Sequence, residues 1–199
     1  MVLNKIRERF QGTFKRMATF FAWLGLEPYM VSLLSIVLAL LASLLFYFSL
    51  GGVIYIGSGI LLFCLSSLLD AIDGAMARMQ GKVSEVGAFM DSFSDRVVEV
   101  LVIGAIILAG MLPLLTGLLF LSTSFLISYA RARAESLGVD LAGVGLMERA
   151  ERTLFLLAGI ILWTIDKRTL NMVLLIASAL NTYTLIQRLH KVLVVSKSP

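Results

Sequence analysis

Cysteine, histidine and charged residues are scarce in this chain of 199 residues. Cys64 is the only cysteine, so the sequence supports neither a disulfide framework nor a cysteine-ligated metal site. His190 is the only histidine, which excludes a metal site or an acid–base pair built on histidines. Charged residues make up 15% of the sequence, whereas about a quarter of a soluble domain is charged. The chemistry of this chain must therefore come from other residue types.

Long apolar runs are abundant, and 59% of the residues are hydrophobic. A helix needs about 20 mostly apolar residues to cross a membrane, and shorter runs suffice where protein shields the helix ends. The sequence therefore predicts an all-α integral membrane protein with about six transmembrane helices, forming a single domain over residues 1–199. The six runs are Met30–Leu50, Val53–Leu69, Val97–Leu112, Leu114–Ile127, Leu154–Ile165 and Met172–Ile186.

Residues 1–27 precede the first of these runs and mix basic with apolar residues. They lack the single apolar core and the cleavage site of a secretory signal. Apolar residues recur at helical spacing opposite Arg9, Lys15 and Arg16, a pattern typical of an amphipathic helix lying in the membrane interface. We expect an interfacial N-terminal helix whose apolar side carries Phe10, Phe14, Met17, Phe20 and Phe21.

The distribution of basic residues predicts the orientation in the membrane. If the N-terminus is cytoplasmic, only Lys167 and Arg168 of the 17 lysines and arginines fall on the outer side. This placement accounts for the net charge of +4 without a nucleic-acid partner. Because the longer polar connections also lie on the cytoplasmic side, we expect a plasma-membrane protein with its chemistry on that face.

Four aspartates stand out in this apolar context: Asp70, Asp73, Asp91 and Asp95. The first pair is spaced i,i+3 and the second i,i+4, so each pair shares one face of its helix. A short turn joins the two helices, which makes them antiparallel neighbours. Burying an aspartate in a membrane costs about 2.5–3.5 kcal/mol, so four of them require compensation. Two Mg²⁺ or Mn²⁺ ions would neutralise four carboxylates; a salt-bridged helix pair and an ion pathway are the alternatives.

The segment Asp70–Asp95 resembles the signature of the CDP-alcohol phosphotransferase family. The signature reads Asp, two residues, Asp-Gly, two residues, Ala-Arg, eight residues, Gly, three residues, Asp, three residues, Asp. Gly74 and Gly87 suit it physically, because glycine leaves a helix surface open to a phosphorylated ligand. All eight defined positions match: Asp70, Asp73, Gly74, Ala77, Arg78, Gly87, Asp91 and Asp95.

The resemblance implies an enzyme that displaces CMP from a CDP-linked lipid with the hydroxyl of an acceptor alcohol. It implies that Asp70, Asp73 and Asp91 bind a first metal ion and that Asp91 and Asp95 bind a second. Asp95 is then also the catalytic base on the acceptor hydroxyl. A homodimer is implied as well. The residues implied for CDP-lipid binding are Asp70, Asp73, Gly74, Ala77, Arg78 and Gly87.

A second group of basic residues occupies Ser128–Glu135, Gly145–Arg152 and Ile186–Lys191. All three segments are expected at cytoplasmic helix ends or loops. Serine, glycerol or free inositol would not need so many arginines, whereas a phosphorylated acceptor would, because arginine binds phosphate bidentately. The alternative is anchoring of the protein by positive charge, with local ion pairs to the interleaved glutamates.

The patterns in these segments resemble the inositol-phosphate branch of the family, which includes phosphatidylinositol-phosphate and archaetidylinositol-phosphate synthases. Bacterial members of that branch often carry lysine where Arg131 stands. The resemblance implies transfer from CDP-diacylglycerol or CDP-archaeol to inositol 1-phosphate. The residues implied for the acceptor phosphate are Ser128, Arg131, Arg149 and Arg188, with Arg152 as an addition.

Three alternative functions share some of these sequence features, and the sequence disfavours two of them. Glycerol 3-phosphate is the nearest alternative acceptor, because it too carries a phosphate. A solute or ion transporter would place polar residues along several helices to the midplane, whereas here they gather near helix ends. An aspartate-rich prenyltransferase would need more helices than this chain can supply.

Overall fold

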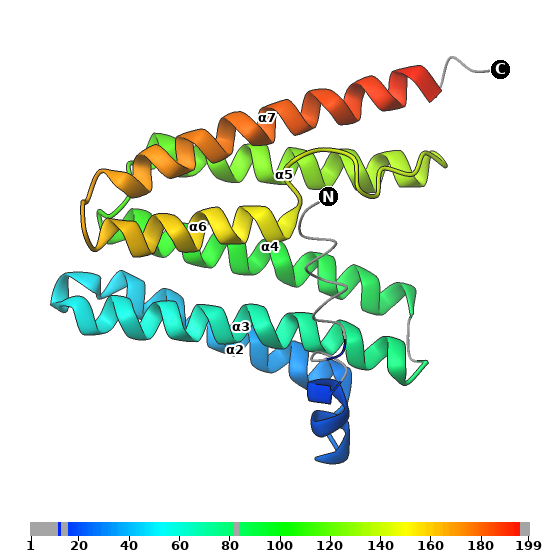
Figure 1. Cartoon of the computed structure of the whole chain (residues 1–199), viewed down its shortest axis with the longest axis horizontal. Coiled ribbons are helices and arrows are strands. Elements are labelled where there is room, and N and C mark those ends of the chain that lie inside the picture. The colour runs from blue at the N-terminus through cyan, green and yellow to red at the C-terminus, as the bar shows by residue number, and fades with distance from the viewer. Residues whose placement is uncertain (1–11, 13–15, 82–83, 196–199) are drawn as a thin grey trace. The chain divides into compact units, whose positions relative to one another are not determined.

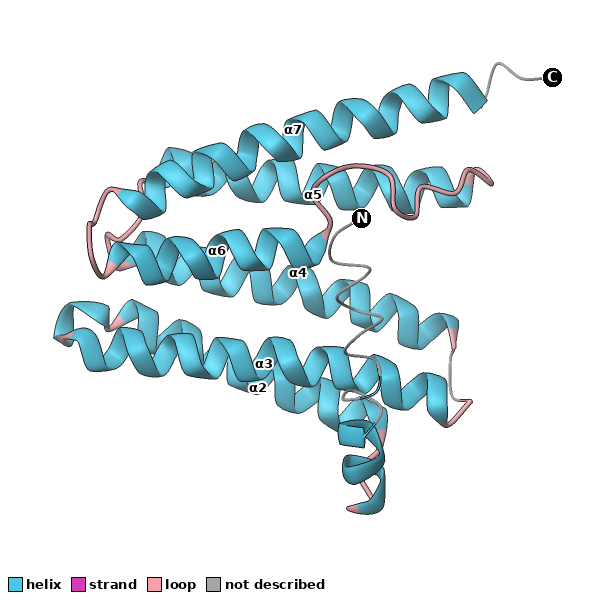
Figure 2. Ribbon diagram, in the orientation of Figure 1, coloured by secondary structure: helices cyan, strands magenta, loops and turns pink. Residues whose placement is uncertain are grey.

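The computed structural model describes Gly12, residues 16–81 and residues 84–195. The described part of the chain is helical and contains no strand, which confirms the all-α prediction (Figures 1 and 2). A short 3₁₀ helix, η1 (Ser49–Gly51), comes after the first long helix. The long helices are α2 (Pro28–Tyr47), α3 (Val53–Met79), α4 (Glu85–Leu108), α5 (Leu114–Ser136), α6 (Arg149–Trp163) and α7 (Thr169–Val195).

Among the described helices, α2, α3, α5 and α7 are long and apolar enough to cross a membrane. Many of their large apolar side chains point outward: Ile54 is 80% exposed and Leu115 is 79% exposed. Apolar surface of this extent suits contact with lipid. The chain is therefore a multi-pass membrane protein, while the expected total of six spanning helices stays a prediction.

The chain forms two compact units, Met1–Ala105 and Ile106–Pro199, with the boundary inside α4. In the first unit, α2 and α3 form a hairpin and pack along their length (Figure 1). The contact is close at Gly59, where an added Cβ would lie 2.7 Å from the Phe46 ring. Both residues are buried, so the absence of a side chain at Gly59 lets the two helices approach.

Residues 16–23 of the predicted interfacial segment form a helix in the same unit. Met17 and Phe21 pack on a core that includes Val31, Leu69 and Ile72. The opposite side is apolar too: Phe20 and Trp23 are exposed, and their ring centroids lie 6.3 Å apart. Phe10 and Phe14 lie outside the described residues, and the interfacial location stays a prediction.

The second unit contains α5, α6 and α7, and α7 packs on both of the others. Asn181 of α7 is fully buried and donates hydrogen bonds to the hydroxyls of Thr123 and Ser124 on α5. Residues 137–148 connect α5 to α6 without forming a long helix. At the start of α6, Glu148 and Glu151 form a reciprocal capping box with each other's backbone N–H groups. The capping box thus determines at which residue α6 begins.

Candidate active site

The predicted aspartates lie on two consecutive helices of the first unit. Asp70 and Asp73 are on the last turns of α3, and Asp91 and Asp95 are on the first turns of α4. Ser84 precedes α4, and its hydroxyl accepts a hydrogen bond from the Gly87 N–H at 3.0 Å. This contact satisfies one of the free N–H groups of the first helical turn and marks where α4 begins.

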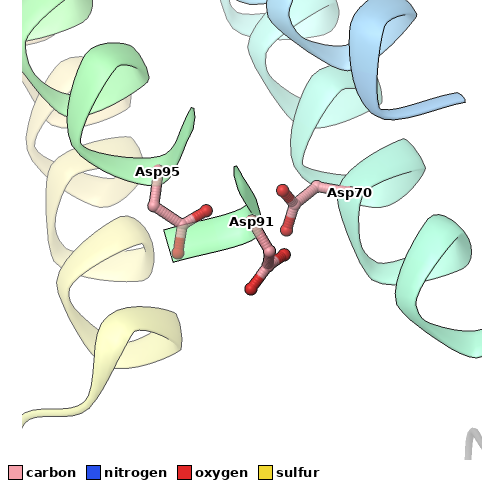
Figure 3. Close-up of side chains that lie close together, drawn as sticks. All are labelled: Asp70, Asp91 and Asp95. Atoms are coloured by element: carbon pink, nitrogen blue, oxygen red, sulfur yellow. The ribbon is translucent and has the colours of Figure 1, made fainter. Parts of the chain in front are cut away.

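Three of the four carboxylates come together. Asp70, Asp91 and Asp95 each offer one carboxylate oxygen, and these oxygens all lie within 4.8 Å of one another (Figure 3). Asp95 is 6% exposed, Asp70 is half-buried and Asp91 is exposed. Carboxylate oxygens are the ligands that Mg²⁺ and Mn²⁺ prefer, and a divalent cation would remove their mutual repulsion. The residues therefore fit a divalent metal site.

Asp73, the remaining aspartate, is not a member of this close group. It is 6% exposed, and its Oδ2 accepts a hydrogen bond from the hydroxyl of Ser32 on α2. It nevertheless lies within electrostatic range of Asp70 and Asp91. Ser32 is a site residue that the sequence analysis missed, because it lies 41 positions from Asp73 inside an apolar run. No motif in the sequence links the two residues.

Two arginines of the same helices accompany the aspartates. Arg96 is half-buried, and its Nη1 lies 3.1 Å from Oδ2 of Asp95. Arg78 is exposed, and its guanidinium lies 3.5 Å from where a Cβ on Gly74 would be. Arg78 therefore lies along the open helix surface at Gly74. Binding of a CDP-lipid by Arg78, Gly74, Ala77 and Gly87 stays a prediction.

In the second unit, Arg188 of α7 is one of the predicted acceptor residues, and two backbone carbonyls hold its guanidinium. It is 2% exposed. Its Nε donates to the Val144 carbonyl at 3.0 Å, and its Nη1 donates to the Ile127 carbonyl at 2.7 Å. Arg131 and Arg152 both lie within electrostatic range of its guanidinium. The structure therefore brings together three of the five predicted acceptor residues from three different helices.

The other members of the predicted acceptor group differ in their surroundings. Arg131 is exposed and its Nε lies 2.8 Å from Oε1 of Glu135, an ion pair of the kind that the alternative expects, and its role toward an acceptor stays a prediction. Arg152 is 2% exposed. Arg149 is the half-buried first residue of α6. The half-buried Ser128 donates to the Ser124 carbonyl within its own helix.

Three clustered carboxylates on two neighbouring helices of a membrane protein are typical of a metal-dependent enzyme. The family model for CDP-alcohol phosphatidyltransferases matches residues 26–184. The chain belongs to this family and is a phosphotransferase. It is similar over nearly its whole length to the archaetidylinositol phosphate synthase of Aeropyrum pernix, with 35% identity over 191 residues, covering 94% of each chain.

Two further relatives extend the comparison. The phosphatidylinositol phosphate synthase of Mycobacteroides abscessus is 32% identical over 199 residues, covering 94% of this chain and 86% of its own. The crystal structure of the Mycobacterium tuberculosis phosphatidylinositol phosphate synthase with CDP-DAG bound has a TM-score of 0.76 and 27% identity. It covers 90% of this chain, and this chain covers 92% of it. The same mycobacterial enzyme has been crystallised with manganese and citrate.

Proposed function

We propose that this protein transfers a phosphatidyl-type group from a CDP-linked lipid to inositol 1-phosphate and releases CMP. The observation that carries the choice of acceptor is the convergence of Arg131, Arg152 and Arg188 in the second unit. The names of the similar archaeal and bacterial synthases support the same acceptor. The donor is CDP-diacylglycerol or CDP-archaeol, and relatives named for each lipid class are similar to this chain.

The donor end of the reaction is assigned to the aspartate signature. Asp70, Asp73 and Asp91 are proposed to hold one divalent ion, and Asp91 and Asp95 a second. Bound Mg²⁺ or Mn²⁺ would offset the charge of the pyrophosphate and of the departing CMP. Arg78 adds a fixed cation for the phosphates, and Gly74, Ala77 and Gly87 are proposed to line the nucleotide site.

The proposed reaction needs a base to take the proton of the acceptor hydroxyl, and we assign this role to Asp95. The acceptor hydroxyl forms a bond to the phosphorus that carries the lipid, and the bond from that phosphorus to CMP breaks. The proton of the hydroxyl passes to the Asp95 carboxylate, which is the catalytic base. Asp95 is 6% exposed, and its Oδ2 lies 3.1 Å from Nη1 of Arg96.

The acceptor end is assigned to the arginines. Arg152 and Arg188 are each 2% exposed, and Arg131, Glu135 and Glu148 lie within electrostatic range of Arg188. An acceptor phosphate would add an anion that arginine binds bidentately. Two N–H groups of Arg188 are engaged by backbone carbonyls. Its remaining N–H groups, together with Arg131, Arg149, Arg152 and the Ser128 hydroxyl, are proposed to bind the acceptor phosphate.

Glycerol 3-phosphate is the second candidate acceptor, because the same arginines would bind its phosphate. We also propose that the protein is a homodimer of the plasma membrane, with its N-terminus and active site on the cytoplasmic side. The asymmetry of lysine and arginine supports this orientation. The resemblance to the family supports the dimer.

A competition between acceptors tests the proposal. Purified protein is given CDP-diacylglycerol or CDP-archaeol, Mg²⁺ and equal concentrations of inositol 1-phosphate, glycerol 3-phosphate, inositol and serine, and the products are identified by mass spectrometry. The phosphorylated inositol lipid is the expected main product. Arg149→Ala is expected to raise the KM for inositol 1-phosphate by about 10-fold or more, because a charge-assisted hydrogen bond is lost. The exposed Arg168→Ala is the control.

Each unexpected product has a distinct meaning. A glycerophosphate lipid would keep the phosphate site and move the protein to the second candidate. A product from free inositol or serine would contradict the phosphate site itself.

A further inference from the structure

A single buried threonine on α7 holds the segment that leads into α6. Thr184 is fully buried. Its Oγ1 accepts hydrogen bonds from the backbone N–H groups of Leu146, at 3.2 Å, and Met147, at 3.0 Å. These two residues are 38 and 37 positions away in the sequence from Thr184. The Met147 bond is buried and the Leu146 bond is partly buried. A side chain that accepts two neighbouring backbone N–H groups, one of them away from water, determines where that backbone lies.

Gly145 makes this contact possible. Its φ is +112°, a conformation that residues with side chains rarely adopt. A Cβ added there would clash with Cγ2 of Thr184 and would force the backbone away. The glycine and the threonine therefore fit one another, and the chain closes tightly onto α7 at this point.

Two more side chains on the same face of α7 hold the same connection. Arg188 donates to the Val144 carbonyl, and Lys191 donates to the Asp140 carbonyl at 2.7 Å. Thr184, Arg188 and Lys191 succeed one another at intervals of four and three residues, so they form one stripe along the helix. The connection from α5 to α6 is thus attached to α7 at three successive points.

The attached backbone leads directly into the pair of α6 arginines. Met147 is two residues before Arg149, and the capping box at Glu148 starts the helix directly after the attachment. Arg152 lies one turn further on, with its backbone N–H bonded to the Glu148 carbonyl. Both arginines therefore depend on where Leu146 and Met147 are held. A shift of about 1 Å in such a position can change catalytic efficiency by about 100-fold.

We propose that Thr184, acting through its hydrogen bonds to Leu146 and Met147, is a positioning residue that sets Arg149 and Arg152 for the phosphate of the acceptor. This inference rests on the proposed function, because it assumes that the arginines bind a phosphorylated polyol. Thr184 itself touches no substrate. Its contribution is the place and direction of the first turn of α6.

Three variants of the full-length protein test the inference. Thr184→Val keeps the shape of the side chain and removes its hydroxyl, leaving the N–H groups of Leu146 and Met147 without that acceptor. Thr184→Ser keeps the hydroxyl and is the conservative rescue. Thr182→Val is the matched control, because the Thr182 hydroxyl donates to the Ser178 carbonyl of its own helix. The KM for inositol 1-phosphate, kcat and the apparent affinity for CDP-lipid are measured for each.

Thr184→Val is expected to raise the KM for inositol 1-phosphate by about 10-fold, with kcat and CDP-lipid affinity changed by no more than about threefold. Thr184→Ser and Thr182→Val are expected to keep wild-type values. A role confined to stability would reduce the fraction of active protein, so it would lower kcat and leave KM unchanged. Should the valine variant not fold, Thr184→Ala replaces it, because the space left by the methyl and hydroxyl groups admits water. The same direction of change in KM is expected.

Binding of inorganic phosphate, measured by titration calorimetry, separates the two proposals. An unchanged acceptor KM in Thr184→Val or Thr184→Ala, or a loss of kcat alone, overturns the inference and leaves the proposed function intact. Wild-type protein that makes no product from inositol 1-phosphate overturns the proposed function. In that case, weakening of phosphate binding by about fivefold or more in Thr184→Val would still support the inference. A smaller change would overturn the inference together with the proposed function.

Discussion

Ser32 and Asp73 illustrate how single residues complete the aspartate site. The hydroxyl of Ser32 donates to Oδ2 of Asp73, and this is the bond that orients the one aspartate outside the close group of three. Hydrogen-bonding partners of metal-binding carboxylates typically contribute 10- to 100-fold to metal affinity, because they fix the orientation of the ligand. Ser32 is therefore expected to affect the metal site without touching a substrate.

Removal of the Ser32 hydroxyl is expected to weaken the site. Ser32→Ala should lower the affinity for Mn²⁺ by about 10-fold, as measured by titration calorimetry or by the electron paramagnetic resonance of free Mn²⁺. Ser32→Thr should retain the affinity, since it keeps the hydroxyl. Ser43→Ala is the control, because the buried Ser43 hydroxyl bonds the Ala39 carbonyl of its own helix. Equal Mn²⁺ affinity in Ser32→Ala and Ser43→Ala would contradict the role of Ser32.

The aspartates are expected to divide between donor binding and proton transfer. Asp95→Asn should abolish turnover and leave CDP-lipid binding largely intact, because the base acts on the acceptor hydroxyl. Asp70→Asn should weaken CDP-lipid binding as well, through loss of a metal ligand. Turnover and CDP-lipid binding are measured separately on each variant. Near wild-type turnover in Asp95→Asn would show that another residue is the base.

At the level of the elements, the approach of α2 to α3 places Ser32 beside Asp73. The two helices are close at Gly59, where the ring of Phe46 occupies the space that a side chain would need. Gly57 is on the same helix, is exposed, and has nothing within 4 Å of its added Cβ. Gly59 is therefore closely packed and Gly57 is not, although both lie on α3.

This difference predicts opposite effects of alanine on stability. Gly59→Ala should lower the free energy of unfolding by about 1–3 kcal/mol, because the added methyl group overpacks against Phe46. Gly57→Ala should leave stability unchanged or raise it by up to about 1 kcal/mol, because alanine favours a helix. The midpoints of thermal unfolding in one detergent compare the two variants. Equal midpoints would contradict close packing at Gly59.

The whole molecule combines an exposed apolar surface with buried carboxylates. Apolar side chains such as Ile54 and Leu115 are exposed, whereas Asp73 and Asp95 are each 6% exposed. Carboxylates buried in a membrane protein need a compensating charge. Arg96 is a partner of Asp95, and a divalent cation supplies the remaining charge in our proposal.

Removal of divalent cations is therefore expected to act on activity and on stability together. EDTA should abolish turnover, and Mg²⁺ or Mn²⁺ should restore it. Mn²⁺ should also raise the midpoint of thermal unfolding, because an ion that binds only the folded state stabilises it. Asp91→Asn protein, which retains only two members of the close group, should show a smaller increase. Undiminished turnover in EDTA would contradict the metal site.

Features that depend on neighbours along the chain could be predicted from the sequence. The apolar runs predicted helices, and the spacing of Asp70, Asp73, Asp91 and Asp95 predicted that each pair shares a face. Both predictions rest on the period of 3.6 residues in a single helix, which needs no knowledge of the fold. The family signature in this segment likewise depends on local spacing alone.

Contacts between distant segments were decided only by the tertiary structure. Ser32 reaches Asp73 across 41 positions, and Thr184 holds Met147 across 37. The structure also leaves Asp73 out of the close group of three carboxylates and pairs Arg131 with Glu135, while it buries Arg188 against two carbonyls. The sequence predicts which residues share a helix face. Which faces meet depends on how side chains such as Phe46 pack against positions such as Gly59, and this determines which polar groups are brought together.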